Sequence, residues 1–314
     1  MGKNNNLHAA KTAKNDEFYT QLSDIEKELN NYKDFFNGKV VYCNCDDPRE
    51  SNFFKFFSMN FERLGLKKLI TTGYKKDGHG VAFVYEGDKN GNRKVDDAEV
   101  EVIELEGNGG YETEECIAFL KEADVVVTNP PFSLFRDYVK QLMDYNKKFL
   151  IIGNSNAITY KEIFPYLKSN EMWLGMNYVK EFIQPNGEIK KFGNICWFTN
   201  VQNPKRNRPL DLYRKYNPTD YPKYDNYDAI NVDKVTDIPE DYDGVMGVPI
   251  TFLDKYCPNQ FEILCLAAGN SWANFTEELK KLNFNPNIKY GGGLGCGIVN
   301  GKPCYARLMI RKVS

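Results

Sequence analysis

The order of apolar and polar positions along the chain predicts a sheet of mostly parallel strands covered by helices. Strand-like and helix-like segments alternate from about residue 17 to 155, and such alternation is typical of parallel sheets. In the helix-like segments apolar residues recur every three or four positions, which gives each helix one face for the core. The buried strands are predicted at 39–45, 67–72, 124–129 and 148–154, and the helices near 23–32, 49–65, 113–122 and 133–143.

Two further pairs of segments extend this alternating pattern. Segments 80–87 and 98–105 are predicted to form the arms of a hairpin-like insertion, with Asn90-Gly91 at its turn. Segments 171–177 and 193–200 predict two more strands around a polar turn. The sequence therefore predicts that antiparallel elements are added to the parallel sheet.

The character of the chain changes after Asn203. The segment that follows is rich in Pro, Tyr and basic residues and has no clear period, so regular elements cannot be assigned to it. We therefore predict a domain boundary near this residue. The predicted parts are a flexible tail at 1–14, a first domain at 15–203 and a C-terminal region at 204–314.

Composition narrows the class of protein. The chain has 314 residues, of which 42% are hydrophobic and 27% charged, as expected for a globular protein large enough for two domains. It has no apolar run long enough to span a membrane and no signal-peptide pattern, so we expect a cytoplasmic protein without a membrane partner. The eight scattered cysteines fit a reducing compartment.

Histidine content and net charge restrict the chemistry. Two histidines, His8 and His79, are too few for a multi-histidine metal site and argue against acid–base catalysis by histidine, so no metal is expected. Cysteines such as Cys43 and Cys45 could be assembled into a zinc site, although buried strand cysteines are the commoner case. The net charge of −2 neither indicates nor excludes nucleic-acid binding, because phosphate contacts need only a local basic surface.

Polar residues and turn residues follow three of the predicted strands. They occur at 44–48 (Asn-Cys-Asp-Asp-Pro), 106–111 (Glu-Gly-Asn-Gly-Gly-Tyr) and 128–132 (Thr-Asn-Pro-Pro-Phe). In open parallel sheets, ligands bind beyond the carboxyl ends of the strands. The sequence therefore predicts a site at this edge.

The tetrapeptide Asn129-Pro130-Pro131-Phe132 offers two fixed hydrogen-bond acceptors and one aromatic face. The amino group of adenine is a poor nucleophile because its lone pair is shared with the ring. The Asn129 side-chain oxygen and the Pro130 carbonyl could hold both amino hydrogens, since the prolines fix the backbone and have no N–H of their own. Phe132 offers a surface on which a base can stack. The alternative is a strand-terminating turn with a core phenylalanine.

Several motifs together resemble one family of enzymes. The tetrapeptide at the end of a strand resembles the catalytic motif of amino-group methyltransferases that use S-adenosylmethionine. Segment 15–20 resembles their N-terminal motif, in which Phe-Tyr-Thr lies against the methionine part of the cofactor. From about residue 14 to its C-terminus the chain is similar to the EcoRI-type adenine-specific DNA methyltransferases. The matching segments, in the family's order, are 14–29, 40–57, 128–139, 149–165, 193–200 and 242–256.

The resemblance implies an α/β fold, namely the Rossmann-like class I methyltransferase fold with a mixed, mostly parallel sheet, and a C-terminal target-recognition region. Residues 15–203 would form the S-adenosylmethionine-binding catalytic domain, and 204–314 the DNA-binding region. The resemblance further implies S-adenosylmethionine as the cofactor and double-stranded DNA as the partner. Catalysis is assigned to Asn129, Pro130, Pro131 and Phe132.

The resemblance also indicates where the cofactor would bind. The Cys-Asp-Asp-Pro loop stands for the family's first cofactor loop, and one of its carboxylates would pair with the ammonium of S-adenosylmethionine; a solvated strand-to-helix turn is the alternative. Where the family usually has acidic residues for the ribose and adenine of the cofactor, this chain has threonine and asparagine. The predicted cofactor-binding residues are Phe18, Tyr19, Thr20, Cys45, Asp46, Asp47, Pro48, Asn52, Thr72 and Asn108.

A basic cluster interleaved with tyrosines follows residue 204. A solvated linker would explain it equally well. In the family's order of motifs, however, the target-recognition region follows the catalytic motifs, which favours contacts with phosphates and bases. The residues predicted to contact substrate DNA are Lys205, Arg206, Arg208, Arg214 and Trp197.

Together these features predict a monomeric, site-specific enzyme that methylates the N6 atom of an adenine flipped out of DNA. Methylation of RNA adenine or of protein glutamine is an alternative, because both chemistries use related tetrapeptides. A catalytically silent DNA-binding protein is another, because the loops at 71–74 and 106–111 depart from the family pattern. The sequence indicates neither the recognition site nor a cognate restriction enzyme.

Overall fold

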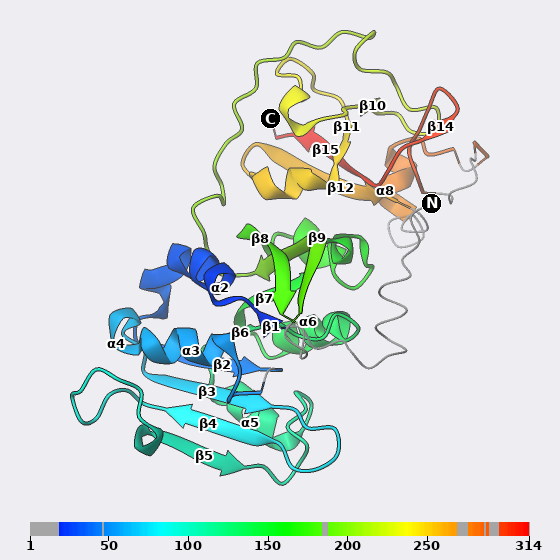
Figure 1. Cartoon of the computed structure of the whole chain (residues 1–314). Helices are drawn as coiled ribbons and strands as arrows, with labels where there is room; N and C mark the ends of the chain where they lie inside the picture. Colours follow the sequence, from blue (N-terminus) through cyan, green and yellow to red (C-terminus); the bar gives the residue numbers. More distant parts are fainter. Residues whose placement is uncertain are drawn as a thin grey trace. The chain divides into compact units, whose positions relative to one another are not determined.

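The computed structural model describes residues 19–45, 47–183, 188–268, 276–285, 287–288 and 295–313. The predicted tail at 1–14, Phe18 and Asp46 lie outside the described residues. The chain divides into two compact units. The first takes the chain up to Ser155 and then Leu174–Asn203, and the second takes Asn156–Trp173 and the chain from Pro204 onwards. In Figure 1 the colours of the first unit run from blue to green, and most of the second runs from yellow-green to red.

A sheet of nine strands forms the centre of the first unit within the described ranges. Four central strands are parallel, in the order β7-β6-β2-β3. Beyond β7 the order continues with β9, β8 and β1, and beyond β3 with the antiparallel β4 and β5. The strands are β1 (Tyr19–Thr20), β2 (Val40–Asn44), β3 (Lys68–Gly73), β4 (Val81–Tyr85), β5 (Val100–Glu104), β6 (Val125–Thr128), β7 (Lys148–Asn154), β8 (Trp173–Ile183) and β9 (Ile189–Thr199).

The predicted α/β fold with a mixed sheet is therefore confirmed. The four predicted buried strands correspond to β2, β3, β6 and β7, and nearly all of their side chains are buried. Burial on both faces explains why their sequences are continuous apolar runs. The parallel part is confined to these four strands, because antiparallel pairs flank it on both sides.

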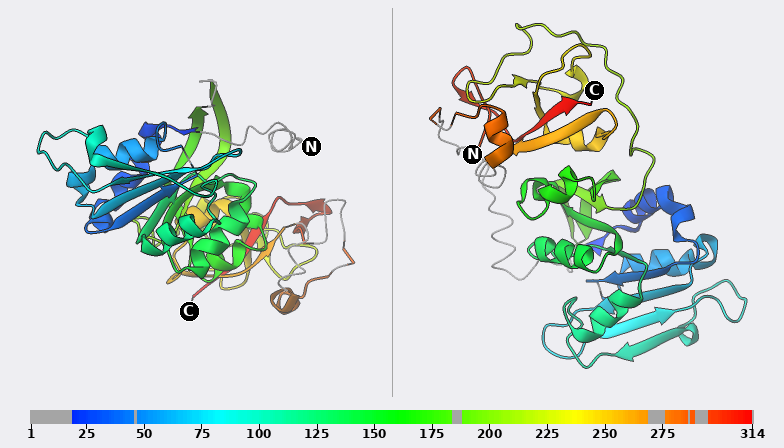
Figure 2. Two further views of the ribbon diagram at one scale, coloured as in Figure 1. Left: turned by 90° about the horizontal axis from the view of Figure 1, so that it is seen from below. Right: turned by 180° about the vertical axis from the view of Figure 1, so that it is seen from behind.

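Helices cover both faces of this sheet, as Figures 1 and 2 show. On one face α2, α3 and α4 pack onto a core that includes Val41, Val127 and Trp197. On the other face Phe119 of α5 contacts Tyr42, and Phe135 of α6 contacts Phe198. The helices are α2 (Leu22–Leu29), α3 (Asn52–Met59), α4 (Phe61–Leu64), α5 (Glu114–Glu122) and α6 (Phe135–Asp144), with the 3-10 helices η1 (Asn30–Phe36), η2 (Asp97–Glu99) and η3 (Ser155–Thr159).

The predicted helix at 49–65 is two helices that meet at Asn60. Ser51 caps the first of them, since its hydroxyl accepts a hydrogen bond from the backbone N–H of Phe53 at 3.2 Å. Asn60 has φ −111° and ψ 12°, which interrupts the helix and starts the short α4. Gly65 ends α4 in the left-handed conformation, with φ 62°.

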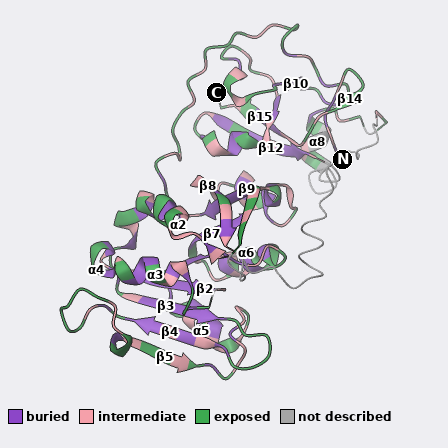
Figure 3. Cartoon of the chain, in the orientation of Figure 1, coloured by how far each residue is buried: buried purple, intermediate pink, exposed green. Residues whose placement is uncertain are grey.

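The hairpin-like insertion is formed by β4 and β5. Acidic side chains in the connection accept hydrogen bonds from backbone N–H groups, as Asp88 does from Gly91 and Arg93 at 2.6 Å each. β5 is the outermost strand on this side of the sheet, and Glu101, Val102 and Glu104 on it are exposed. Figure 3 shows the change from buried inner strands to this exposed outer strand.

The second unit has a smaller sheet with the order β10-β11-β15-β12. Its core includes Met246, Val248, Cys265 and Ile310, which are fully buried. The described strands are β10 (Ile230–Asn231), β11 (Met246–Pro249), β12 (Phe261–Ala267), β13 (Ile298–Val299), β14 (Lys302–Pro303) and β15 (Arg307–Lys312). The helices are α7 (Phe164–Lys168) and α8 (Thr276–Lys281), with the 3-10 helices η4 (Val235–Asp237) and η5 (Ile250–Lys255).

Segment 156–173 belongs to the second unit although it precedes the last two strands of the first sheet. α7 lies in this segment and contacts β12. Lys168 pairs with Glu278 at 2.8 Å. The predicted first domain, 15–203, includes this segment. Only its contacts with residues far along the chain show that it packs in the second unit. No helix among the described residues is long and apolar enough to cross a membrane.

Candidate active site at the carboxyl edge of the sheet

The strand order reverses between β2 and β6. From β2 the chain proceeds to β3 on one side, and from β6 it proceeds to β7 on the other. All four strands are parallel, so their carboxyl ends meet at one edge. Such a reversal separates the loops that follow the two strands and leaves a crevice in which ligands bind. The predicted site loops at 44–48 and 128–132 follow these two strands.

A side-chain hydrogen bond bridges the ends of β2 and β6. Residues are paired between the strands as far as Tyr42 and Val126. Beyond this point the Thr128 hydroxyl donates to the backbone carbonyl of Asn44, and both residues are buried. The bond therefore closes the sheet at the point where the two loops diverge.

The Asn-Pro-Pro-Phe turn begins directly after this bridge. Asn129 is 7% exposed, and Pro130 is also buried. The carbonyl of Pro131 accepts a hydrogen bond from Leu134 N–H at 2.9 Å, which closes the turn before α6. The turn thus holds the Asn129 side chain in a largely desolvated position at the sheet edge.

Phe132 packs into an aromatic group that we call the Phe132 cluster, consisting of Phe132, Phe182 and Phe192. The ring centroids of Phe132 lie 6.4 Å from Phe182 and 6.5 Å from Phe192, with edge-to-face geometry. Phe132 remains partly exposed. No sequence motif marks Phe182 and Phe192 as site residues, because they lie in strands about 50 to 60 residues further along the chain.

The loop after β2 is held in an unusual backbone conformation. Cys45 has φ 80°, in the left-handed region that favours glycine. The carbonyl of Asp47 accepts a hydrogen bond from Ser51 N–H at 2.8 Å, and its carboxylate accepts one from Arg49 N–H at 2.9 Å. Asp47 is exposed and Pro48 is buried, which leaves the carboxylate open to solvent at the edge.

The structure brings the N-terminal motif to the same loop. Asn52, the first residue of α3, donates from its side-chain amide to the carbonyl of Thr20 at 2.8 Å. Thr20 pairs with Phe182 across β1 and β8, while Tyr19 pairs with Ile183. The Thr20 hydroxyl is buried and has no hydrogen-bond partner among the described residues. Three predicted cofactor-binding residues therefore converge, although Asn52 lies more than 30 positions further along the chain than Tyr19 and Thr20.

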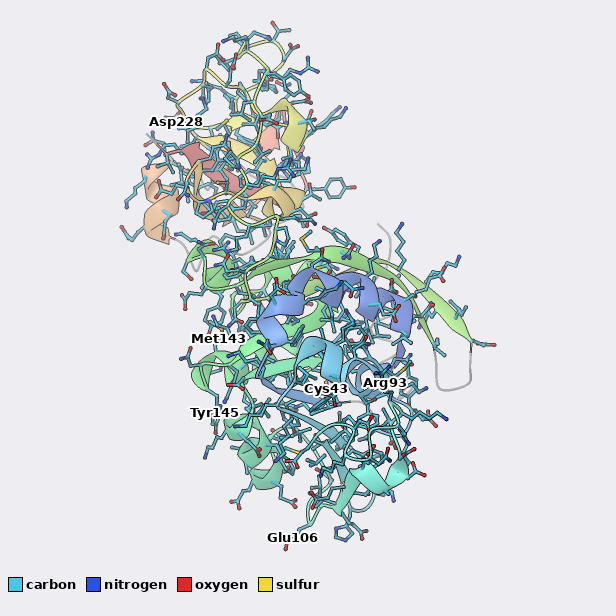
Figure 4. The ribbon with its side chains drawn as sticks, turned by 90° about the vertical axis from the view of Figure 1, so that its left-hand side faces the viewer. Cys43, Arg93, Glu106, Met143, Tyr145 and Asp228 are labelled. Carbon is cyan, nitrogen blue, oxygen red and sulfur yellow. The ribbon has the colours of Figure 1, made fainter. Side chains whose placement is uncertain are left out.

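The loop at 106–111 also reaches the edge. The Asn108 carbonyl accepts a hydrogen bond from Lys75 N–H at 2.9 Å, just beyond β3. The Asn108 side-chain oxygen accepts one from Gly110 N–H at 3.0 Å. Glu106 lies at the rim of the unit in Figure 4, whereas Cys43 lies in its interior. Asn108 is thus near the end of β3, as expected for strand-end loops.

Thr72 does not fit its predicted role. It is fully buried, and its hydroxyl lies 2.8 Å from the Tyr42 hydroxyl on the inner face. A side chain with no exposed surface and a bonded hydroxyl cannot contact a ligand directly. The Thr72 side chain therefore links β3 to Tyr42 of β2, and Thr72 is not proposed as a cofactor contact.

Trp197 likewise does not fit a contact with DNA. It is 0% exposed and packs against Phe53 at a ring-centroid distance of 6.2 Å. The expectation was wrong because the sequence of β9 does not distinguish an aromatic residue in the core from one at the surface.

The predicted basic residues of the second unit have different surroundings. The guanidinium of Arg206 lies 3.6 Å from the centroid of the Trp173 ring, and burial lowers its pKa. Arg214 pairs with Asp237 at 3.8 Å in a solvent-exposed position. Lys205 and Arg208 line a cleft of about 540 Å³, together with Lys255, Tyr213, Asp211 and Asp254. We call this the basic cleft, because it has three cationic and two acidic side chains.

Metal ligation is not indicated by this geometry. Across the part of the chain that the structure describes, no group of three or more His, Cys, Asp or Glu side chains is placed to hold a metal ion. Among the described residues of the strand-end loops, the polar groups are instead amides and hydroxyls, with the exposed carboxylates of Asp47 and Glu106.

Comparison with known proteins gives consistent matches over nearly the whole chain. The family model described as "Adenine-specific methyltransferase EcoRI" matches residues 6–313. The type II methyltransferase M.EcoRI of Escherichia coli is 50% identical over 291 residues, covering 84% of this chain and 89% of that protein. Two further relatives each match over 98% of both chains. They are the type II methyltransferases M.MgeORF184P of Mycoplasma genitalium, 40% identical, and M.MpnI of Mycoplasma pneumoniae, 38% identical.

Proposed function

The chain belongs to the EcoRI family of adenine-specific methyltransferases, and we propose that it transfers a methyl group from S-adenosylmethionine to the N6 atom of adenine in double-stranded DNA. The observation that carries this proposal is the position of Asn129. Its side chain is buried in a proline-fixed turn at the point where the strand order reverses. Ligands of open parallel sheets bind at such points.

In the proposed reaction Asn129 and Pro130 hold the adenine amino group. The Asn129 side-chain oxygen and the Pro130 carbonyl accept its two hydrogens, so the nitrogen lone pair turns away from the ring. When bound, S-adenosylmethionine supplies an electrophilic methyl group. The same two oxygens stabilise the positive charge that develops on N6 during transfer. The methylated nitrogen then loses one proton to water, so no protein base is required.

Phe132 and Pro131 shape the place of the base. The partly exposed Phe132 ring offers a stacking face, and Phe182 and Phe192 pack against this ring edge to face. Pro131 closes the turn through its bond to Leu134 N–H. Because an adenine in a duplex cannot reach a buried side chain, the target base must leave the helix before transfer.

The described residues at the edge fit S-adenosylmethionine. Its ammonium group would be held by the exposed Asp47 carboxylate, next to Cys45 and Pro48 in the same loop. Tyr19 and Thr20, bonded through Asn52, would line its methionine part. The Thr20 hydroxyl, which has no hydrogen-bond partner among the described residues, is a polar group that a ligand could satisfy. Asn108 would bond the edge of its adenine. Phe18 and Asp46 keep their predicted roles but lie outside the described residues.

DNA would bind to the second unit through the basic cleft. Lys205 and Arg208 are proposed as phosphate contacts. Arg214 could exchange its exposed pair with Asp237 for a phosphate at little cost. Arg206 is better suited to anchor the segment, because it is stacked on Trp173 and half removed from solvent.

The proposal is tested by product analysis with the purified full chain. Labelled S-adenosylmethionine is supplied with duplex DNA, with RNA or with protein, and the products are digested and separated by mass spectrometry. We expect N6-methyladenine from duplex DNA only. N6-methyladenine from RNA, or methylated glutamine, would replace the proposal with one of the alternative substrates.

A second measurement addresses a silent DNA-binding protein on the same scaffold. Calorimetric titration of the full chain with S-adenosylmethionine should give saturable binding of one cofactor per chain. Binding of DNA without any binding of the cofactor would favour the silent protein.

A further inference from the structure

We propose that Tyr138 and Gln141 of α6 are positioning residues that hold the Asn129 turn and the two cofactor loops in one fixed arrangement. This inference rests on the function proposed above. Neither side chain belongs to the Asn-Pro-Pro-Phe tetrapeptide or to a predicted cofactor loop, and neither is proposed to touch the cofactor or the adenine. Both lie on α6, the helix that follows the Asn-Pro-Pro-Phe turn.

The first connection runs from α6 to the loop after β2. The Tyr138 hydroxyl donates to the side-chain oxygen of Asn44, and both residues are buried. The Cys45 thiol lies 3.5 Å from the same oxygen, as a second donor. With the bond from the Thr128 hydroxyl to the Asn44 carbonyl, Asn44 is held from β6, from α6 and from its own loop. We call Asn44, Cys45, Thr128 and Tyr138 the Asn44 clamp.

The Asn44 clamp holds Cys45 in a strained backbone conformation. A left-handed φ of 80° is strained for a residue with a Cβ, and glycine would adopt it without this cost. Such a conformation persists only where surrounding contacts determine it. The bonds to the Asn44 side chain fix the residue directly before Cys45, so they hold the first residue of the cofactor loop in place.

The Tyr138 hydroxyl is a dependable donor for this purpose. Burial raises the pKa of Tyr138 well above its ordinary value of 10.0, so the hydroxyl stays protonated over the physiological range. The bond to Asn44 is between neutral groups and does not depend on pH. It also lies in surroundings from which water is excluded, where an unmade bond is costly.

The second connection runs from α6 to the loop at 106–111. The Gln141 side-chain amide donates to the carbonyl of Tyr111 at 3.1 Å. The Tyr111 and Tyr138 rings meet edge to face, with centroids 5.2 Å apart. One helix of ten residues therefore contacts both proposed cofactor loops and begins three residues after Phe132. Met143 and Tyr145, labelled in Figure 4, mark the far end of this helix.

The decisive variant is Tyr138→Phe, which removes the hydroxyl and keeps the ring. We expect the dissociation constant for S-adenosylmethionine to rise about three- to tenfold, the effect of losing one buried hydrogen bond. kcat should fall as well, while KM for DNA stays within about twofold, because the basic cleft is untouched. Calorimetry and steady-state kinetics of the full chain measure all three quantities.

Tyr32→Phe is the matched control. Tyr32 is another buried tyrosine of the same unit. Its hydroxyl donates to Glu28 at 2.9 Å and accepts from Asn203 at 3.4 Å, and both partners lie outside the cofactor loops. We expect Tyr32→Phe to lower thermal stability and to leave the cofactor dissociation constant unchanged. The inference is wrong if Tyr138→Phe leaves this constant unchanged, or if Tyr32→Phe raises it equally.

A second test, with Tyr138→Phe placed in a Cys45→Gly variant, distinguishes a positioning effect from a general loss of rigidity. Cys45→Gly removes the strain that the Asn44 clamp is proposed to hold. In this background Tyr138→Phe should change the cofactor dissociation constant by less than about twofold. An undiminished effect of Tyr138→Phe would show that the hydroxyl does not act through Cys45, and would overturn this part of the inference.

Gln141→Leu tests the second connection with a side chain of similar size. We expect a rise in the cofactor dissociation constant of about two- to fivefold, and no rise would remove Gln141 from the inference. Failure of the inference is distinguishable from failure of the proposed function. In the first case the unmodified chain binds S-adenosylmethionine and methylates DNA, while in the second the unmodified chain itself does not methylate DNA.

Discussion

The polar groups at the carboxyl edge of the first unit differ in charge and in burial from those in the basic segment of the second unit. At the edge, Asn44 and Asn129 are neutral and only 3% and 7% exposed. In the segment after Pro204, Lys215 and Arg214 are charged and solvated, and they pair with Glu240 and Asp237. Buried neutral groups keep one geometry, whereas exposed ions exchange partners at little cost. The first arrangement suits group transfer, and the second suits binding to a phosphate backbone.

The variant with the largest expected effect on this comparison is Asn129→Ala. We expect kcat to fall about 100- to 1,000-fold, as when one preorganised group is removed from a site that stabilises developing charge. The dissociation constant for DNA should change less than twofold, because the basic cleft remains. Single-turnover methylation and fluorescence anisotropy with labelled duplex measure the two effects separately. Activity close to that of the unmodified chain would remove Asn129 from the proposed chemistry.

The opposite result is expected in the basic cleft. Arg208→Ala combined with Lys255→Ala should weaken DNA binding about tenfold or more at low salt and reduce the salt slope by about two. kcat at saturating DNA should stay within about twofold. Anisotropy titrations at several salt concentrations measure the slope. An unchanged slope would mean that neither side chain contacts phosphate.

Glu28 adds a third case to this comparison, because it is a carboxyl group that is buried as deeply as the neutral side chains of Asn44 and Asn129. Burial raises its pKa above the ordinary value of 4.5, although bonds from Met176 N–H, Asn177 and Tyr32 act in the opposite direction. The folded chain therefore binds this proton more tightly than the unfolded chain. Its stabilising contribution is complete below about pH 4.5 and is lost as the pH rises through the folded pKa.

The matching variant is Glu28→Gln. Its free energy of unfolding should decrease less with rising pH above 4.5 than that of the unmodified chain, because glutamine does not titrate. Urea unfolding at several pH values measures both curves. Curves that run parallel would show that Glu28 has the same pKa in the folded and unfolded chains.

The smallest effect is expected for Lys215→Ala. Lys215 is exposed and pairs with Glu240 at 2.6 Å, and this pair raises the pKa of the lysine. Glu240 holds Lys215 more closely than Asp237 holds Arg214, and Lys215 lies outside the basic cleft, so it should contribute little to DNA binding. We expect an affinity within twofold and an unchanged salt slope in the same anisotropy titrations. A loss as large as that of the basic-cleft variant would extend the binding surface to this residue.

The sequence predicted the central strands well, because burial on both faces leaves a direct trace in β2, β6 and β7 as β-branched or apolar runs. It also placed the loops of the candidate site at strand ends, since a change from apolar to polar residues marks where a strand stops. The positions of Asp47, Asn108 and Asn129 at one edge follow from the parallel arrangement alone.

Contacts between distant positions left no such trace. Tyr138 lies 94 residues from Asn44, and its helical spacing gave it only the role of a core residue. Trp197 was expected to contact DNA and Thr72 to contact the cofactor, because tryptophan and threonine side chains suit such contacts. Both side chains are instead buried in the core. The stacking of Arg206 on Trp173 depends on where segment 156–173 packs, which periodicity does not report.

The hairpin of β4 and β5 has a consequence for the behaviour of many copies in solution. An outermost strand presents unpaired backbone groups to which the edge of another molecule could add. On β5, Glu101 and Glu104 are exposed beside the apolar Val102. Stacking two copies along this edge would bring carboxylates of like charge together, so the hairpin protects the sheet against intermolecular strand pairing and aggregation.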